Sequence, residues 1–172
     1  MPKFVDWTPT HDLNIDTFFE LAPLSASDIV YDLGAGDGRL LFKALEYGAG
    51  KCVGLEIDPE MIDMARELAI GKGLDGKVTF IECDIMTADV SPASVILCYL
   101  WPTASAELRK KFADELKPGT RVVIETFPVR QWKAAKIIQR AGANFYLYVM
   151  PPERDPDVSD EPYFDPIFEE YW

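Results

Sequence analysis

The sequence is poor in the residues that build metal and disulfide sites. Its 172 residues include one histidine and three cysteines. Cys52, Cys83 and Cys98 show no CxxC spacing and lie in apolar stretches, which predicts buried, reduced thiols rather than a disulfide framework. His11 has no partners in the pattern of a zinc site or a Ser-His-Asp triad, so we expect a surface or helix-capping residue and no metal site.

Long hydrophobic runs and an excess of positive charge are also missing. No apolar run approaches the roughly 20 residues that span a bilayer, and the first residues lack the apolar core of a signal peptide. We therefore expect a cytoplasmic protein with no membrane partner. The net charge is -12, and the acids are dense after residue 152. Such a chain repels nucleic acid and attracts basic protein surfaces, although the acids are equally explained by solubility.

What is present is the composition of a globular protein. Hydrophobic residues make up 48% of the chain and charged residues 27%, and the length suits one domain with a sizeable core. We expect a single domain over residues 1–150, of which 1–10 form an aromatic N-terminal arm. An acidic, aromatic C-terminal extension over 151–172 follows. The sequence leaves the oligomeric state open.

Strand and helix signals alternate along the chain, which favours an α/β fold with a parallel sheet covered on both faces. Thr8 and Pro9 have the residue types of a helix N-cap and first helical position, so the first helix is predicted from residue 9. Residues 133–140 are ambiguous between a helix and a strand that turns at 141–143. The strands are predicted at 28–33, 51–57, 77–82, 94–99, 120–126 and 144–149, and the helices at 9–22, 38–47, 59–70 and through Leu108, Phe112 and Leu116.

A glycine-rich turn, Asp32-Leu33-Gly34-Ala35-Gly36-Asp37-Gly38-Arg39, joins the first strand to the next helix. Glycine allows positive φ and close approach of a ligand to the backbone, and the helix start offers unpaired amides, so the turn predicts a nucleotide-type ligand. The dinucleotide pattern G-x-G-x-x-G is not met, because Arg39 stands in the place of the third glycine. Two aspartates beside the turn would repel a pyrophosphate. S-adenosylmethionine, whose methionine end is cationic at its amine and which has no phosphate, suits the turn better.

Acids also stand at the ends of the next two predicted strands. In an open parallel sheet ligands bind at the carboxyl ends of the strands. Glu56 suits the ribose hydroxyls of the cofactor, and Asp84 suits the adenine amino group, with Ile85 against the ring. The predicted cofactor-binding residues of this edge are Asp32, Gly34, Ala35, Gly36, Gly38, Glu56, Ile57, Asp84 and Ile85.

Aromatic residues follow the fourth strand, where the run is Tyr99-Leu100-Trp101-Pro102 instead of Asn-Pro-Pro-Tyr. Aromatic walls attract a cationic amine and exclude water. Tyr99 and Trp101 are therefore the candidate catalytic residues, with Tyr99 orienting the acceptor nitrogen. Phe4 and Trp7 of the arm are predicted to line the same channel.

The turn resembles the first motif of class I S-adenosylmethionine-dependent methyltransferases. With the arm 4–9, the run 53–56, Trp132 and 146–148, the chain resembles the small archaeal and mitochondrial protein lysine methyltransferases over residues 4 to about 150. Asp6, Trp7 and the acidic extension depart from that family's pattern.

The resemblance implies a Rossmann-like, doubly wound, mostly parallel seven-strand sheet with an antiparallel C-terminal strand. It further implies S-adenosylmethionine as cofactor, S-adenosylhomocysteine as product, and in-line methyl transfer to a protein lysine. Thr8 would lie against the cofactor, and 133–139 would be a strand. Two alternatives stay open: a small-molecule methyltransferase with the same cofactor residues, and a non-catalytic module that only binds S-adenosylmethionine.

Overall fold

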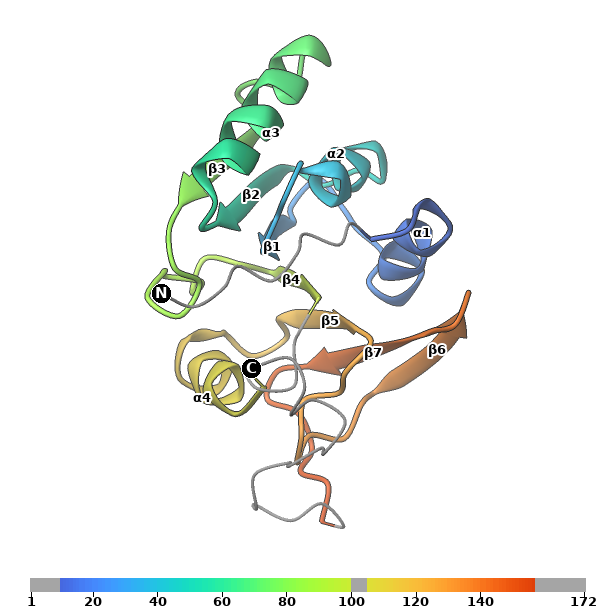
Figure 1. Ribbon diagram of the computed structural model, residues 1–172. Coiled ribbons are helices and arrows are strands. Elements are labelled where there is room, and N and C mark those ends of the chain that lie inside the picture. Colours follow the sequence, from blue (N-terminus) through green and yellow to red (C-terminus); the bar gives the residue numbers. More distant parts are fainter. Residues whose placement is uncertain (1–9, 100–104, 157–172) are drawn as a thin grey trace, which may run out of the picture.

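The computed structural model describes residues 10–99 and 105–156, and in this part of the chain one seven-stranded sheet carries the fold (Figure 1). The strand order is β3-β2-β1-β4-β5-β7-β6. The first five strands are parallel, and β7 runs antiparallel to both of its neighbours. This confirms the predicted α/β, mostly parallel sheet. The elements are α1 (Asp12–Leu21), β1 (Ile29–Leu33), α2 (Arg39–Glu46), β2 (Lys51–Glu56), α3 (Pro59–Gly71), β3 (Val78–Glu82), β4 (Val95–Tyr99), α4 (Ser105–Glu115), β5 (Arg121–Glu125), β6 (Lys136–Arg140) and β7 (Ala143–Val149).

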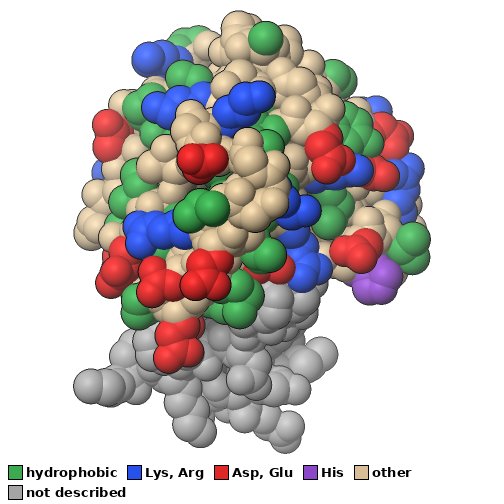
Figure 2. Space-filling view, turned by 90° about the horizontal axis from the view of Figure 1, so that it is seen from above, with side chains coloured by type: hydrophobic (Ala, Val, Ile, Leu, Met, Phe, Trp, Pro, Cys, Tyr) green, Lys and Arg blue, Asp and Glu red, His purple; other side chains and the backbone are tan. Residues whose placement is uncertain are grey.

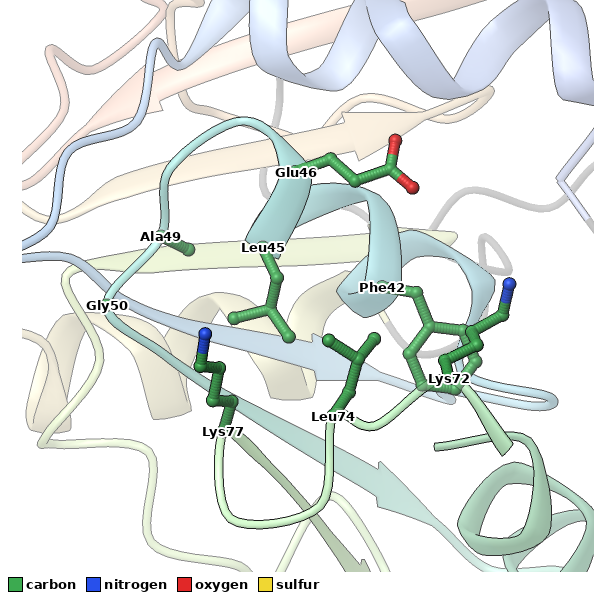
Figure 3. Close-up of a pocket in the computed structure, with 8 residues that line it drawn as sticks. All are labelled: Phe42, Leu45, Glu46, Ala49, Gly50, Lys72, Leu74 and Lys77. Carbon is green, nitrogen blue, oxygen red and sulfur yellow. The ribbon is translucent and has the colours of Figure 1, made fainter. Parts of the chain in front are cut away.

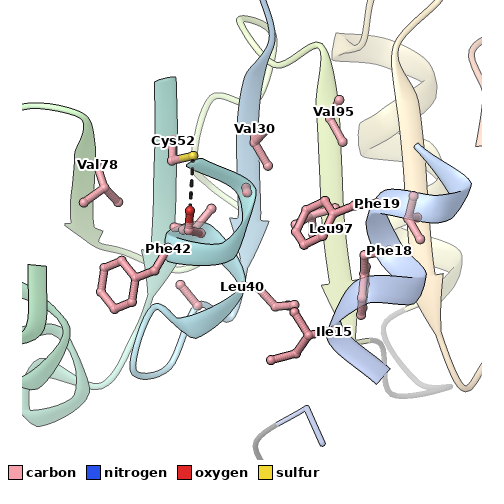
Figure 4. Packing of buried hydrophobic residues seen from close by; sticks show 14 of the residues in the cluster. Ile15, Phe18, Phe19, Val30, Leu40, Phe42, Cys52, Val78, Val95 and Leu97 are labelled. Atoms are coloured by element: carbon pink, nitrogen blue, oxygen red, sulfur yellow. Dashed lines mark hydrogen bonds between the residues drawn. The ribbon is translucent and has the colours of Figure 1, made fainter. Parts of the chain in front are cut away.

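Two apolar layers form because successive side chains of a strand point to opposite faces of the sheet. One layer packs against α1, α2 and α3, and the other packs against α4. Figure 4 shows Phe18 and Phe19 on the side of α1 that faces the sheet. Cys52 lies in the same layer, where its thiol donates a hydrogen bond to the carbonyl of Leu41. Cys52 and Cys98 are buried free thiols, as predicted, whereas Cys83 is half-buried.

The strand order reverses between β1 and β4. From β1 the chain adds β2 and β3 on one side, and it then crosses to β4 on the other side. The helices that come after β1 and β4, which are α2 and α4, pack in different layers of the fold, and this arrangement opens a crevice at the carboxyl edge between the two strands. The glycine turn follows β1 and therefore lies at this crevice.

The first helix begins later than predicted, because His11 provides the cap. Its Nδ1 accepts a hydrogen bond from the backbone N–H of Leu13 at 3.2 Å, and α1 starts at Asp12. The prediction that the helix starts at residue 9 with Thr8 as its N-cap is thus wrong, while the capping role expected for His11 is confirmed.

The ambiguous segment 133–140 forms a strand from Lys136 onward. It pairs with β7 through a two-residue turn, in which Ala141 and Gly142 both have positive φ, at 47° and 84°. This is the backbone twist that tight hairpins favour. The strand implied by the family resemblance is confirmed, because pairing with β7 outweighs the local helix propensity.

An ionic cluster joins strands at the amino edge of the sheet, which is opposite the carboxyl edge that carries the glycine turn. Asp28 precedes β1 and is 7% exposed. Its Oδ1 accepts hydrogen bonds from Ser94 Oγ at 2.7 Å and from Arg121 Nη2 at 2.6 Å, and its Oδ2 accepts one from the backbone N–H of Ser25 at 2.7 Å. Burial raises the pKa of Asp28, but the hydrogen bonds outweigh burial and leave this pKa below its usual value. Three neighbouring strands are therefore joined where β1, β4 and β5 begin.

None of the described helices is both long enough and apolar enough to cross a membrane.

Candidate active site

The glycine turn is held in place by the neighbouring strand. The backbone N–H groups of Gly34 and Ala35 both donate to the carbonyl of Leu55 in β2, at 2.8 and 3.0 Å. Gly34 has φ +84°, and a Cβ built on it would meet nothing within 4 Å. Gly38 has φ +80°, but a Cβ there would lie 2.6 Å from the ring of Phe80. The first glycine thus leaves open space for a ligand beside the backbone, whereas the last allows α2 to start against β3.

Glu56 at the end of β2 closes the other side of the turn. One carboxylate oxygen accepts the N–H of Gly36 at 2.9 Å, and the other accepts those of Ile57 at 2.8 Å and Asp58 at 3.1 Å. The half-buried carboxylate is fixed by three backbone amides and keeps lone pairs for further donors. An acceptor fixed in this way suits a pair of hydroxyl groups.

The end of β3 is more open. Asp84 is exposed, and its Oδ1 accepts the backbone N–H of Met86 at 2.8 Å. Ile85 is half-buried and Ile57 is 56% exposed. The parallel pairing of β2 with β3 brings these residues to the same edge as the glycine turn.

Asp32 is the most perturbed acid at this edge. It is 3% exposed, and no described residue donates a hydrogen bond to its carboxylate. Burial raises its pKa well above the usual value, and the negative charges of Glu56 and Asp37 raise this pKa further. A ligand that brings a cationic N–H group would supply what this carboxylate lacks.

Asp37, the second acid of the turn, is engaged by its own neighbour. Arg39 donates from Nε to Asp37 Oδ1 at 3.0 Å and from Nη2 to Asp37 Oδ2 at 2.7 Å. Nη1 of the same guanidinium donates to the carbonyl of Thr10 at 3.4 Å. Arg39 therefore neutralises one acid of the turn and ties the turn to the segment just before α1.

Tyr99 ends β4 and is level with Glu125, the last residue of β5, in the parallel register. Both residues line a pocket of about 260 Å³. Its remaining lining comes from the start of α1, from Thr126 and from the turn between β6 and β7: Thr10, His11, Asn14, Thr126, Ala141, Gly142 and Ala143. A pocket next to the glycine-turn crevice, on the β5 side, is where a second substrate can meet the cofactor.

Comparison with known proteins identifies the family. A family model described as the ANTKMT methyltransferase domain matches residues 32–136. A curated protein-lysine N-methyltransferase from Saccharolobus islandicus (strain REY15A) is 35% identical over 151 residues, which cover 85% of this chain and 94% of that relative. The chain belongs to this methyltransferase family. It uses S-adenosylmethionine.

Two further relatives bear on the cofactor and on the acceptor. An RNA methyltransferase structure from Salinibacter ruber, in complex with S-adenosyl-L-homocysteine, has a TM-score of 0.83 and 34% identity, and the match covers 89% of this chain and all of that one. The adenine nucleotide translocase lysine N-methyltransferase of Mus musculus is 27% identical over 117 residues. The chain spans about half the length of this mouse relative, with 51% covered. The relatives therefore share the cofactor chemistry but are named for different acceptors.

The methyltransferase brings most of its predicted cofactor residues together at one edge. Asp32, Glu56 and Asp84 offer carboxylates that suit the three donor-bearing parts of S-adenosylmethionine, which are its amine, its ribose hydroxyls and its adenine amino group, and Gly34 leaves open space beside them. Four predicted site residues lie outside the described residues: Phe4, Trp7, Thr8 and Trp101.

Two residues of the pocket were missed by sequence reasoning. Glu125 was read as part of a strand, and Asn14 as part of a helix. An acid at the carboxyl end of a predicted strand was the available signal for Glu125, since the same signal singled out Glu56. Nothing in the sequence pointed to Asn14.

A larger cavity of about 360 Å³ lies at the amino edge of the methyltransferase (Figure 3). Lys72 and Lys77 line it together with Phe42, Leu45 and Leu74. None of the predicted site residues lines this cavity, and Gly50 and Lys77 of its lining directly precede β2 and β3. A choice of site by cavity volume alone would therefore point to the amino edge of the sheet, where none of the predicted site residues lines the cavity.

Proposed function

We propose that this methyltransferase transfers a methyl group to the side-chain nitrogen of a lysine in a protein substrate. The observation that carries the proposal is the character of the pocket beside Tyr99. Among the described residues that line it, none is lysine or arginine, and Glu125 contributes a carboxylate. A pocket with one carboxylate and no described basic side chain to neutralise it suits a cationic acceptor, and the relatives from Saccharolobus islandicus and Mus musculus are named for lysine.

The cofactor residues have distinct proposed roles. The backbone of Gly34, Ala35 and Gly36 would receive the methionine part, whose amine would face Asp32. Glu56 would accept the ribose hydroxyls. We further propose that Asp84, Ile57 and Ile85 receive the adenine, that Gly38 shapes the helix start, and that Thr8 lies against the cofactor.

S-adenosylmethionine, when bound, supplies an electrophilic methyl group on a sulfonium. The acceptor has to present a lone pair, but with a reference pKa near 10.4 only about 1 in 2,500 lysines is neutral at pH 7. Desolvation in the pocket lowers the lysine pKa, whereas the carboxylate of Glu125 favours the ammonium form, so the proton has to be removed before methyl transfer. Tyr99 would orient the nitrogen in line with the methyl and sulfur, and such alignment contributes several kcal/mol. Phe4, Trp7 and Trp101 keep their predicted role as channel walls.

RNA is the second candidate acceptor, because the relative from Salinibacter ruber is named an RNA methyltransferase. Two observations favour lysine over RNA. The net charge of -12 opposes binding of a phosphate backbone. On the face that Figure 2 shows, lysine and arginine side chains are interspersed with acids rather than gathered into a basic patch. A small-molecule acceptor is the further alternative, whereas membership of the methyltransferase family argues against a non-catalytic role.

The deciding experiment is incubation of the full chain with methyl-labelled S-adenosylmethionine and a cell extract. Label that resists ribonuclease, is released by proteinase and maps to lysine by mass spectrometry is the expected result. Label released by ribonuclease would establish RNA as the acceptor, and label confined to metabolites would establish a small molecule. A Tyr99→Phe variant that keeps full turnover would remove the orienting role of Tyr99. We also propose a cytoplasmic location, which fractionation of cells would test.

A further inference from the structure

A buried carboxylate and a buried amide are joined in the pocket beside Tyr99. Glu125 at the end of β5 is 4% exposed, and Asn14 on α1 is 5% exposed. Asn14 Nδ2 donates to Glu125 Oε1 at 3.1 Å, and Thr10 Oγ1 donates to Glu125 Oε2 at 3.2 Å. Burial raises the pKa of Glu125, and the two hydrogen bonds offset this only in part. The pair has no assigned role in holding the cofactor.

The amide oxygen of Asn14 is the unexplained group. It is fully buried, and within the described part of the chain nothing donates a hydrogen bond to it. Buried acceptors without a donor are rare in folded proteins because they lose their hydrogen bond to water without replacement. Asn14 lines the pocket, so a ligand there that donates hydrogen bonds is the partner that would satisfy this oxygen once the side chain turns toward it.

The rest of the pocket narrows the chemistry of that ligand. The carboxylate of Glu125 accepts hydrogen bonds and carries negative charge, and the described lining includes no lysine or arginine to neutralise it. The other titratable groups that line the pocket are His11 beside α1 and Tyr99 on β4. A volume of about 260 Å³ is small for a ligand pocket and suits a narrow chain with a polar end.

We propose that Glu125 and Asn14 bind the ammonium group of the acceptor and that Glu125 takes its proton before methyl transfer. This inference rests on the proposed lysine methyltransferase function. The carboxylate accepts one proton from the ammonium, which leaves a neutral amine and a neutral Glu125. The amine lone pair then forms the new C–N bond, and the S–CH₃ bond breaks with its electron pair going to sulfur. The products are a methylated ammonium and S-adenosylhomocysteine, and Glu125 returns its proton to water.

The first test measures methyl transfer to poly-L-lysine by the wild type, Glu125→Gln and Glu125→Asp. Removing a general base costs about 10²- to 10⁴-fold, so we expect kcat/KM of Glu125→Gln at pH 7 to fall at least 100-fold. We expect its rate to rise about tenfold per pH unit as the free amine increases, and Glu125→Asp to recover part of the loss. Unchanged binding of S-adenosylhomocysteine by calorimetry shows that each variant is folded. A pair that only fastens α1 to β5 would leave the shape of the pH profile unchanged, and that result overturns the proton-transfer role.

The second test does not depend on methyl transfer. The full chain, saturated with S-adenosylhomocysteine, is titrated with n-butylammonium or with neutral n-pentanol, and the backbone amide signals of residues 141–143 are followed by NMR. Saturable shifts with n-butylammonium alone are expected, with at least tenfold weaker binding in Glu125→Gln and in Asn14→Leu. Equal responses to both probes, or none in the wild type, overturn the ammonium site. If the wild type transfers no methyl to poly-L-lysine, the lysine proposal fails separately, and the n-butylammonium titration decides the site.

Discussion

Replacing Asp32 with asparagine should make the folded protein more stable and its cofactor binding weaker. Asp32 is 3% exposed, its carboxylate has no described hydrogen-bond donor, and the negative charges of Glu56 and Asp37 act on it. Asparagine keeps the shape of the side chain and removes the buried charge. Functional sites commonly retain groups of this kind at a cost in stability.

The expected gain follows from the raised pKa of Asp32. Because the folded-state pKa lies above the unfolded value of about 3.9, ionised Asp32 opposes folding at pH 7. We expect Asp32→Asn to raise the unfolding free energy by about 1–2 kcal/mol, within the range for such substitutions. At about 2–4 °C per kcal/mol for a chain of this size, the melting temperature rises by about 2–8 °C. A lost hydrogen bond to a charged group costs about 1.5–3 kcal/mol, so affinity for S-adenosylhomocysteine falls at least about tenfold.

The assay is denaturant unfolding of both proteins between pH 4 and pH 8, with calorimetry of S-adenosylhomocysteine binding at pH 7. The stability difference should shrink as the pH falls through the folded pKa of Asp32, because wild-type Asp32 then becomes neutral as well. Asp28→Asn is the matched control, since it also removes a buried charge but from a carboxylate with four hydrogen bonds. We expect this control to lose stability. An Asp32→Asn variant that is less stable than the wild type at pH 7 would refute the reasoning.

Three further predictions concern the rest of the chain. Arg121→Met should lower the unfolding free energy by about 2–3 kcal/mol at pH 7, measured by urea unfolding, because it leaves Asp28 buried without its ionic partner. The folded pKa of Asp28 lies below the unfolded value of about 3.9, so this loss of stability should disappear as the pH falls through the folded pKa. Gly34→Ala should lose about 1–2 kcal/mol of unfolding free energy, because alanine is strained in the left-handed backbone conformation, and should no longer bind S-adenosylhomocysteine. Gly38→Ala should be the less stable of the two variants, because its Cβ also meets the ring of Phe80 in β3. A thiol reagent should label only Cys83 in the folded protein, as mass spectrometry of the intact chain would show, since the other two cysteines are buried.

The features that were predictable from sequence are those encoded by neighbouring residues. The glycine turn, Glu56 and Asp84 each lie at the end of a strand or just past it, so their arrival at one edge needs only the rule that parallel strands share their carboxyl ends. The strand at Lys136–Arg140 needed the family resemblance, because its local propensity is ambiguous and its partner strand decides the outcome.

The features that were not predictable depend on distant contacts or on competing local ones. The hydrogen bond between Asn14 and Glu125 joins residues 111 positions apart, and no local pattern contains it. The start of α1 was misplaced because His11 competes as a cap with a threonine-proline pair that has the more usual residue types. The pairing of Asp37 with Arg39 was not predicted either, although the two residues are only two positions apart in the chain.

The cluster around Asp28 affects which parts of the sequence can change during evolution without loss of the fold. It ties β1, β4 and β5 at their amino ends, while the turn, Glu56, Tyr99 and Glu125 all lie at the carboxyl ends. The residues that tie the strands together are therefore different from those proposed to meet the ligands. Mutations that retarget the enzyme to a new acceptor can accumulate at one edge without loosening the fastening at the other. This separation agrees with the finding that similar proteins are named for different acceptors, lysine in one case and RNA in another.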